Sequence, residues 1–252
     1  MKHVIITGAS RGFGEYIARK SAASDTTLHL VARSNMESLK SDLTEAGATV
    51  ITYKADLTKT EETDNWFSEI VRNIQSDDPD AIILYNNAGM LYPMGPIGKY
   101  DMQDYRKNLE LNFVAALLVG HQFIHYFRDN NCTKRIINIS SGAARNPYHG
   151  WSHYCSTKAG LDMFTRCISL EQQDTEFPVE ALSFSPGPLD TKMQDEIRET
   201  SPEDFSNVDK FISLKEQNML GDPEEVAGVL HDLVWSKDFP NGKILDISDV
   251  EG

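Results

Sequence analysis

The stretch TGASRGFG, residues 7–14, follows the short apolar run Val4–Thr7 and leads into a helical pattern at Gly14–Ala23. Glycines at a strand–helix turn let the backbone approach a pyrophosphate, which then lies at the positive end of the helix. A glycine triplet alone is equally compatible with a plain glycine-capped turn. Its position on the first strand–helix turn of the chain favours a dinucleotide site. The turn residues expected to bind the cofactor are Gly8, Ser10, Arg11, Gly12, Phe13 and Gly14.

Beyond this turn, short β-branched runs alternate with longer amphipathic segments. The expected strands are Val4–Thr7, Leu28–Ala32, Val50–Tyr53, Ala81–Tyr85, Arg135–Ile139, Val179–Phe184 and Lys243–Asp246. The helical stretches between them include Gly14–Ala23, Glu61–Ile74, Tyr105–Arg128 and Ser156–Gln173. This alternation predicts a doubly wound α/β fold, in which a parallel sheet carries helices on both faces.

The chain has 252 residues, and no repeat, linker or low-complexity tract divides it. We therefore expect a single domain over residues 1–252. The irregular region Pro186–Pro223 carries four prolines and a polar helical stretch around Met193–Glu199. We interpret residues 188–222 within it as a lid-like insertion rather than a second domain.

Charge and cysteine content bear on partners and compartment. The 38 acidic residues outnumber the 24 basic ones, and the net charge of −14 argues against nucleic acid or an anionic membrane as partner. Cys132, Cys155 and Cys167 follow no metal-ligand spacing and indicate a reducing compartment. The first apolar run is too short for a signal peptide, so we expect a cytoplasmic protein. His121 and His125 lack a third ligand, and no metal site is predicted.

The end of the second expected strand bears on the choice of cofactor. NAD enzymes usually place an acid there to bind the ribose hydroxyls, whereas this strand ends in Val31-Ala32-Arg33-Ser34. Arg11 of the glycine-rich turn can reach the same place. Two guanidinium groups around a 2′-phosphate would form charge-assisted hydrogen bonds. The sequence therefore favours NADP(H), with Arg11, Arg33 and Ser34 near the phosphate.

Tyr154 and Lys158 are four residues apart at the start of a helical stretch, so both project from one face. An ammonium group, helped by oxidised nicotinamide, would stabilise phenolate and lower the tyrosine pKa from about 10. Most such pairs are ordinary helix-surface neighbours. Ser141 favours a functional pair, because it follows the strand Ile136–Ile139 at the sheet edge where open α/β folds bind ligands. Its hydroxyl can donate a hydrogen bond to a substrate oxygen.

Further motifs follow one another along the chain: residues 7–14, Asn86-Asn87-Ala88-Gly89, Asn112, Ser141, Tyr154, Lys158 and Pro186-Gly187. In order and spacing they resemble the short-chain dehydrogenase/reductase family over essentially the whole chain. The resemblance implies a Rossmann-type sheet of seven parallel strands in the order 3-2-1-4-5-6-7. It implies that Tyr154 is the general acid/base and that Lys158 lowers its pKa and binds the nicotinamide ribose. Ser141 would position the carbonyl, and Asn112 would hold a water in a proton relay to Lys158.

The same resemblance implies further cofactor contacts. Asp56 would face the adenine, and Thr191 would meet the nicotinamide amide. The other residues expected around the cofactor are Leu57, Asn86, Asn87, Ala88, Gly89, Pro186, Gly187 and Leu189.

Three stretches narrow the resemblance: NPYHGWSHYC (146–155), AGLDMF (159–164) and PGPLDTKMQ (186–194). They are similar to the sepiapterin reductase branch and most of all to bacterial benzil reductases that form (S)-benzoin. This implies a small-molecule substrate, a vicinal diketone of which NADPH reduces one carbonyl. Tyr148 and Trp151 favour a flat, apolar substrate near Tyr154. The residues expected to close over it are Met90, Leu91, Tyr92, Met193 and Phe205, although core packing explains Met90 and Phe205 equally well.

Other activities are compatible with the same residues. Sepiapterin reductases are expected to hold the pterin with a carboxylate near the C-terminus, where this chain has Asp246; a solvated strand-end acid is an equal explanation. A 3-oxoacyl or hydroxysteroid-type reductase would use the same scaffold. An NADPH-sensing protein without turnover is disfavoured by the complete set of four catalytic residues. The helices around His121 and after Ser156 resemble the family's dimer-forming pair, so we expect a homodimer or homotetramer.

Overall fold

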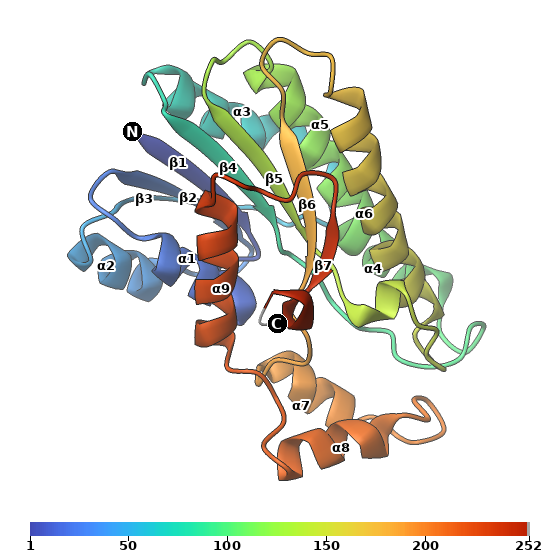
Figure 1. Cartoon of the computed structure of the whole chain (residues 1–252). Coiled ribbons are helices and arrows are strands. Elements are labelled where there is room, and N and C mark those ends of the chain that lie inside the picture. The colour runs from blue at the N-terminus through green and yellow to red at the C-terminus, as the bar shows by residue number, and fades with distance from the viewer. Residues whose placement is uncertain (251–252) are drawn as a thin grey trace.

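The computed structural model describes residues 1–250 and contains a seven-stranded parallel sheet (Figure 1). The strands are β1 (Lys2–Thr7), β2 (Thr26–Ala32), β3 (Thr49–Lys54), β4 (Ala81–Asn86), β5 (Thr133–Ile139), β6 (Glu180–Ser185) and β7 (Ile244–Asp246). Their order is β3-β2-β1-β4-β5-β6-β7. The expected fold class is therefore confirmed.

Helices cover both faces of the sheet (Figure 1). One face carries α1 (Phe13–Ser21), α2 (Glu37–Glu45) and α9 (Pro223–Trp235). The other face carries α3 (Thr63–Gln75), α4 (Met102–Leu109), α5 (Ala115–Phe127) and α6 (Ser152–Glu171). None of the helices within residues 1–250 is both long and apolar enough to cross a membrane.

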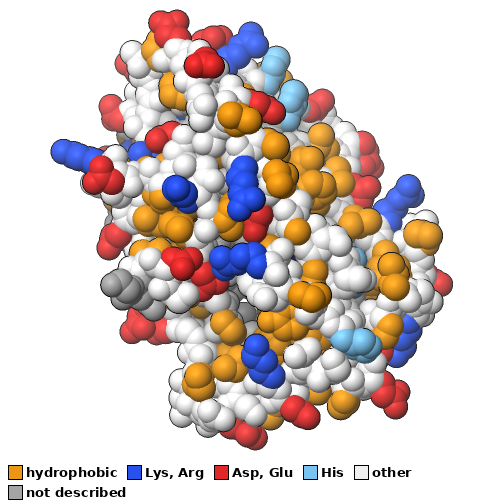
Figure 2. Space-filling model, turned by 45° about the vertical axis from the view of Figure 1, so that its right-hand side comes forward, with side chains coloured by type: hydrophobic (Ala, Val, Ile, Leu, Met, Phe, Trp, Pro, Cys, Tyr) orange, Lys and Arg blue, Asp and Glu red, His pale blue; other side chains and the backbone are white. Residues whose placement is uncertain are grey.

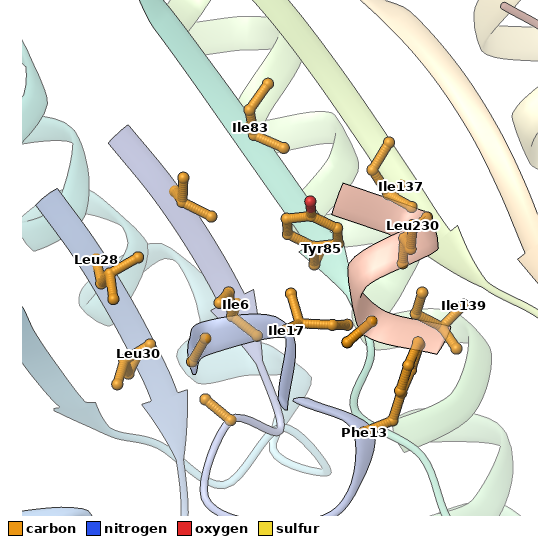
Figure 3. Close-up of a cluster of buried hydrophobic side chains, with 14 of the residues drawn as sticks. Ile6, Phe13, Ile17, Leu28, Leu30, Ile83, Tyr85, Ile137, Ile139 and Leu230 are labelled. Atoms are coloured by element: carbon orange, nitrogen blue, oxygen red, sulfur yellow. The ribbon is translucent and has the colours of Figure 1, made fainter. Parts of the chain in front are cut away.

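The central strands are buried on both faces, which explains their unbroken apolar sequences. Successive side chains of β4 alternate between the two cores: Ile83 packs on the side of α1 and α9, and Ile82 on the side of α3 and α5. Figure 3 shows Ile83 in the first core, in one cluster with Ile17 of α1 and Leu230 of α9. Full burial of one such side chain is worth about 1.5–3 kcal/mol. These two cores hold the parallel strands in place, with their carboxyl ends along one edge of the sheet.

Two expected helices differ from those observed. The stretch Tyr105–Arg128 is not one α-helix, because a π-helical turn at Glu110–Val114 separates α4 from α5. The helix expected from Ser156 begins at Ser152, so that Tyr154 lies in its first turn. Trp151 occupies the N-cap of α6 and makes no side-chain cap. The usual Ser, Thr, Asp or Asn signal for a helix start is therefore missing.

The proposed lid contains two short helices, α7 (Lys192–Arg198) and α8 (Val208–Glu216), beyond the carboxyl ends of the strands (Figure 1). A parallel bridge between Leu189 and Gly221 joins the two ends of this segment. Phe205, between the helices, is fully buried and stacks on Trp151 with ring centroids 4.4 Å apart. A Cβ on Gly150 would collide with the Asp204 carbonyl, so glycine permits this close approach.

Candidate active site

A cavity of about 760 Å³ lies at the carboxyl ends of the strands, between the sheet and α7. Figure 2 shows hydrophobic side chains gathered where the lid meets the body of the molecule. The wall of the cavity contains most of the expected cofactor and catalytic residues: Gly8, Ser10, Arg11, Gly12, Phe13, Arg33, Ser34, Leu57, Asn87, Ala88, Gly89, Ser141, Tyr154, Lys158, Pro186, Gly187, Leu189 and Thr191. The expected substrate residues there are Tyr148, Trp151, Met193 and Asp246. Gly14, Asp56, Asn86 and Asn112 lie outside this wall.

The glycine-rich turn is interlocked with the segment after β4. Gly8 has φ +67°, and a Cβ there would lie 2.8 Å from Ala88 Cα. A Cβ on Gly14 would lie 2.5 Å from Gly8 O, so the absence of a side chain at Gly14 permits this close packing, and a direct contact of Gly14 with the cofactor stays a prediction. Asn87 Nδ2 donates to Thr7 O at 3.0 Å, and Thr7 Oγ1 accepts from Asn87 N at 3.0 Å. These contacts hold the turn open in front of the N-terminus of α1, where a phosphate would bind.

The end of the cavity beside β2 is basic. Arg11 and Arg33 both lie in its wall with exposed side chains, and Ser10 Oγ donates to Ser34 Oγ at 3.4 Å. The carboxylate of Asp56 accepts from Thr58 N at 3.1 Å and Thr58 Oγ1 at 2.8 Å. Asp56 therefore stabilises its own turn, while its neighbour Leu57 supplies the apolar wall.

Tyr154 and Lys158 lie side by side in the middle of the cavity wall. Both are buried, and Lys158 Nζ lies 5.6 Å from the centroid of the Tyr154 ring. Lys158 Nζ donates to Ile139 O at 2.7 Å, which holds it at the end of β5. Ser141 Oγ accepts from Ala143 N at 3.2 Å and caps the turn that follows β5. The Ser141 hydroxyl proton thus stays available to a neighbouring oxygen.

Burial dominates the electrostatics of this pair. It raises the pKa of Tyr154 to about 12, against the opposing effect of a hydrogen bond with Ser141. It lowers the pKa of Lys158 to about 8, opposed by the Asp162 carboxylate. Burial therefore outweighs the hydrogen bond with Ser141, and the expected lowering of the Tyr154 pKa by Lys158 together with oxidised nicotinamide stays a prediction. At neutral pH the phenol is protonated, as a proton donor must be, and most of the lysine carries its charge.

Asn112 lies behind Lys158 in the π-helical turn. Its side chain makes three hydrogen bonds within the protein. Oδ1 accepts from Met90 N at 2.8 Å, and Nδ2 donates to Met90 O at 2.8 Å and to Asn108 Oδ1 at 2.8 Å. A Cβ on Gly89 would lie 3.2 Å from Asn112 Oδ1 and 3.8 Å from Lys158 Nζ, so the three residues meet. π-Helical turns occur often at functional sites, because they redirect backbone groups. Both polar atoms of the Asn112 side chain thus have partners within the protein.

The other end of the cavity is aromatic. The Trp151 ring lies 5.5 Å from the Tyr154 ring, nearly perpendicular to it, and 5.2 Å from Tyr148. Phe205 supports Trp151 from behind as part of the core, whereas Met90 and Met193 line the cavity itself. Sequence reasoning did not single out Met94, Ile197 and Phe211, which also line it. Nothing in their local sequence marks them: the packing of residues 188–222 brings Ile197 and Phe211 to this place, and Met94 comes from the segment between β4 and α4.

Asp246 lies in the wall with its carboxylate already paired. Oδ2 accepts from Ser185 Oγ at 2.7 Å and Arg145 Nη2 at 3.2 Å. Oδ1 accepts from Ser248 N at 3.3 Å and Ser248 Oγ at 3.2 Å. Both oxygens thus bind partners in the protein, and the Arg145 guanidinium balances the charge.

The histidines at 121 and 125 stack with centroids 6.0 Å apart. Among the residues that the structure describes, no three His, Cys, Asp or Glu side chains gather as a metal site. The cavity wall holds the hydroxyl of Ser141, the phenol of Tyr154 and the ammonium of Lys158 beside the turn of residues 7–14.

The fold and this site define an oxidoreductase that acts on CH–OH or C=O groups with a nicotinamide cofactor. The chain belongs to the short-chain dehydrogenase family, whose model matches residues 2–202. It is 39% identical over 249 residues to a Bacillus cereus protein described as "Benzil reductase ((S)-benzoin forming)", covering 99% of this chain and 100% of the relative. It is 31% identical to the sepiapterin reductase of Rattus norvegicus, over 98% and 96% of the two chains.

The fold of this chain is also similar to a solved structure. The crystal structure of a short chain dehydrogenase/reductase from Saccharomyces cerevisiae matches with a TM-score of 0.84 and 27% identity. The match covers 99% of this chain and 97% of that one. The overall architecture is thus shared with that structure over nearly the whole chain.

Proposed function

We propose that this protein uses NADPH to reduce one carbonyl of an aromatic vicinal diketone such as benzil, giving an α-hydroxyketone of the (S)-benzoin type. The observation that carries the proposal is the position of Tyr154. Its phenol is buried between the Lys158 ammonium and the aromatic wall of Trp151 and Tyr148. The 39% identity to a Bacillus cereus protein described as a benzil reductase supports the same substrate class.

The residues present suit NADP(H). The turn at residues 7–14 leaves room for a pyrophosphate, because nothing lies within 4 Å of a Cβ placed on Gly12. Arg11 and Arg33 would pair with the 2′-phosphate, and Thr191 would bind the nicotinamide amide. Bound NADPH would supply the hydride. Lys158 would donate to its ribose hydroxyls and keep a positive charge beside Tyr154.

The protein's own groups manage the proton. Ser141 would donate a hydrogen bond to the substrate oxygen, and Tyr154 would transfer its hydroxyl proton to that oxygen as negative charge develops there. A general acid of this kind contributes typically about 10²–10⁴-fold to the rate. The main-chain carbonyl of Asn112 would hold the water through which Lys158 and Tyr154 are reprotonated. The side chain of Asn112 would keep Met90 and the loop after β4 in place.

Two observations favour a diketone over the alternatives. Both carboxylate oxygens of Asp246 already accept hydrogen bonds, and Arg145 balances its charge, so it is a poor anchor for a pterin. The wall formed by Tyr148 and Trp151 suits flat rings better than a long acyl chain. We propose that residues 188–222 act as a lid over this wall and exclude water when substrate is bound.

The test is an assay of NADPH oxidation with benzil, sepiapterin and an acetoacetyl thioester, followed by chiral analysis of the product. We expect the highest kcat/KM for benzil and a single α-hydroxyketone enantiomer. Tight NADPH binding without oxidation by any diketone would exclude this function and leave a cofactor-binding role. A preference for sepiapterin would mean that Asp246 changes its partners when substrate binds.

We also propose a homodimer or homotetramer in the cytoplasm. Leu118 of α5 and Met163 and Leu170 of α6 are exposed, which supports packing of these helices against another copy. The three free cysteines support a reducing compartment. Light scattering of the purified protein would test the assembly, and a monomer at micromolar concentration would contradict it.

A further inference from the structure

Gln194 is a buried polar residue in the wall of the cavity whose amide is not used by the protein. It lies on α7 beside Met193, and only 5% of its surface is exposed. Its amide oxygen has no hydrogen-bond partner within residues 1–250. Leaving a buried polar group unpaired costs about 1–3 kcal/mol. Because this oxygen is an acceptor, a carbonyl ligand removes the cost only when the terminal amide turns and places its NH2 group in this position.

The same end of the cavity holds a second group of this kind. The indole Nε1 of Trp151, a residue 4% exposed, has no partner either. The rest of this end is apolar, with Met94, Ile197 and Phe211 in the wall. A purely hydrocarbon ligand would leave both polar groups unpaired. A ligand suited to this end therefore combines flat apolar groups with at least one hydrogen-bonding atom.

Gln194 is the more adaptable of the two groups. The terminal torsion of a glutamine is broad and roughly two-fold, so a half-turn presents either the amide oxygen or the NH2 group. Trp151 is held by Phe205 at 4.4 Å on one side and by Tyr148 at 5.2 Å on another, so its ring cannot turn. The amide of Gln194, carried by the lid, is thus the group able to adjust to a substrate oxygen.

We propose that the Gln194 amide donates a hydrogen bond to the second carbonyl oxygen of the substrate, the one that is not reduced. The proposal rests on the proposed reduction of vicinal diketones. Tyr154 and Ser141 take the reacting oxygen, and Gln194 takes its neighbour from the opposite, lid side of the cavity. Gln194 is then the residue that selects dicarbonyl over monocarbonyl substrates. The reaction itself is unchanged: the reacting carbon gains a hydride, its oxygen gains the Tyr154 proton, and the second carbonyl remains intact.

The experiment compares two substrates that differ by one oxygen. Benzil has two adjacent carbonyls, and deoxybenzoin has the same two rings with one carbonyl. The test variant is Gln194→Met, which keeps the length of the side chain and removes the hydrogen bonds. The matched control is Glu199→Gln, an exposed position at the end of α7 outside the cavity wall. KM, kcat and the Kd for NADPH are measured for each protein.

For Gln194→Met we expect KM for benzil to rise about tenfold, the worth of one hydrogen bond to a buried group. KM for deoxybenzoin and the Kd for NADPH should stay within about twofold of wild type, as should every value for Glu199→Gln. If Gln194→Met does not fold, Gln194→Leu is used in the same comparison.

Equal losses for the two substrates would overturn the proposal, because they would indicate a packing role. A raised Kd for NADPH would also overturn it and would place the amide against the nicotinamide. Failure of the wild type to reduce benzil would instead refute the proposed function, and this inference with it.

Discussion

The replacement Asp162→Asn tests the electrostatics of the site most directly. Burial lowers the pKa of Lys158 to about 8, and the Asp162 carboxylate, one helical turn away, opposes this shift. For two charges about 8 Å apart at an effective dielectric constant of about 20, Coulomb's law gives roughly 2 kcal/mol, or about 1.5 pH units. The variant keeps an oxygen to accept the 2.6 Å hydrogen bond from Ser183 Oγ. We therefore expect the fold to survive and the pKa of Lys158 to fall.

The assay is the pH profile of kcat/KM for NADPH, which reports the ionisation of the free enzyme. Lys158 is charged below its pKa, so activity is present at low pH and is lost as the pH rises through that value. The wild type should lose activity above about pH 8, the value that burial sets for Lys158. Asp162→Asn should lose it about 1.5 units earlier, which makes it roughly 15-fold slower at pH 8 and nearly equal to wild type below about pH 6.

The control is Glu171→Gln at the exposed end of the same helix, where solvent screens the charge. Its profile should coincide with that of the wild type. An unchanged break in Asp162→Asn, or a break at higher pH, would refute the assignment of this limb to Lys158. A uniform loss at all pH values would show instead that Asp162 acts through the structure of the site.

Three further outcomes are expected. Tyr154→Phe should lower kcat at least about 100-fold while the Kd for NADPH, measured by fluorescence, stays within about twofold; a variant that keeps most of its activity would rule out Tyr154 as the proton donor. Replacing Arg11 and Arg33 together by alanine should raise the Kd for NADPH about 30-fold and leave that for NADH nearly unchanged; equal effects on both cofactors would misplace the 2′-phosphate. Burial lowers the pKa of His29 to about 3, whereas the unfolded chain binds this proton near pH 6.5. Stability should therefore fall as the pH drops from 6.5 towards 3, by up to about 1.4 kcal/mol per unit in urea unfolding, and an identical fall in His29→Gln would assign it to other groups.

The fold was predictable because the signals for it are local. All seven strands were identified from short apolar runs, and each observed strand agrees with its prediction to within two residues at either end. Such runs arise because both faces of a parallel sheet are buried. The start of α6 was placed four residues late, since Trp151 at the N-cap gives no capping signal. The π-helical turn at Glu110–Val114 was not predicted either, because a change of helical period leaves no mark in hydrophobic spacing.

The residues of the candidate site likewise fall into those that the sequence predicted and those that it did not. Ser141 after β5 was predicted by its position, and Gly187 after β6 was predicted from the family resemblance; both lie in the cavity wall. The lid residues were harder to predict, because their place depends on long-range packing. For Phe205 the sequence was equally compatible with a place over the substrate and with core packing, and in the structure it supports Trp151 from behind. No role could be assigned to Gln194 from the stretch 186–194, since only the structure shows that its amide oxygen lacks a partner.

The two ends of the cavity therefore respond differently to change. At the cofactor end, the turn of residues 7–14 and the segment after β4 interlock through the backbone, and a Cβ on Gly8 or Gly14 would collide with main-chain atoms. Substitution there disrupts the turn itself. At the substrate end the wall is made of side chains, and α7 presents Met193 and Gln194 from a separate segment. We expect Met193 and Gln194 to tolerate substitution without displacement of Tyr154 or the turn of residues 7–14. The choice of carbonyl compound is thus separable from hydride transfer, and we expect Gln194→Met to alter the first while preserving the second.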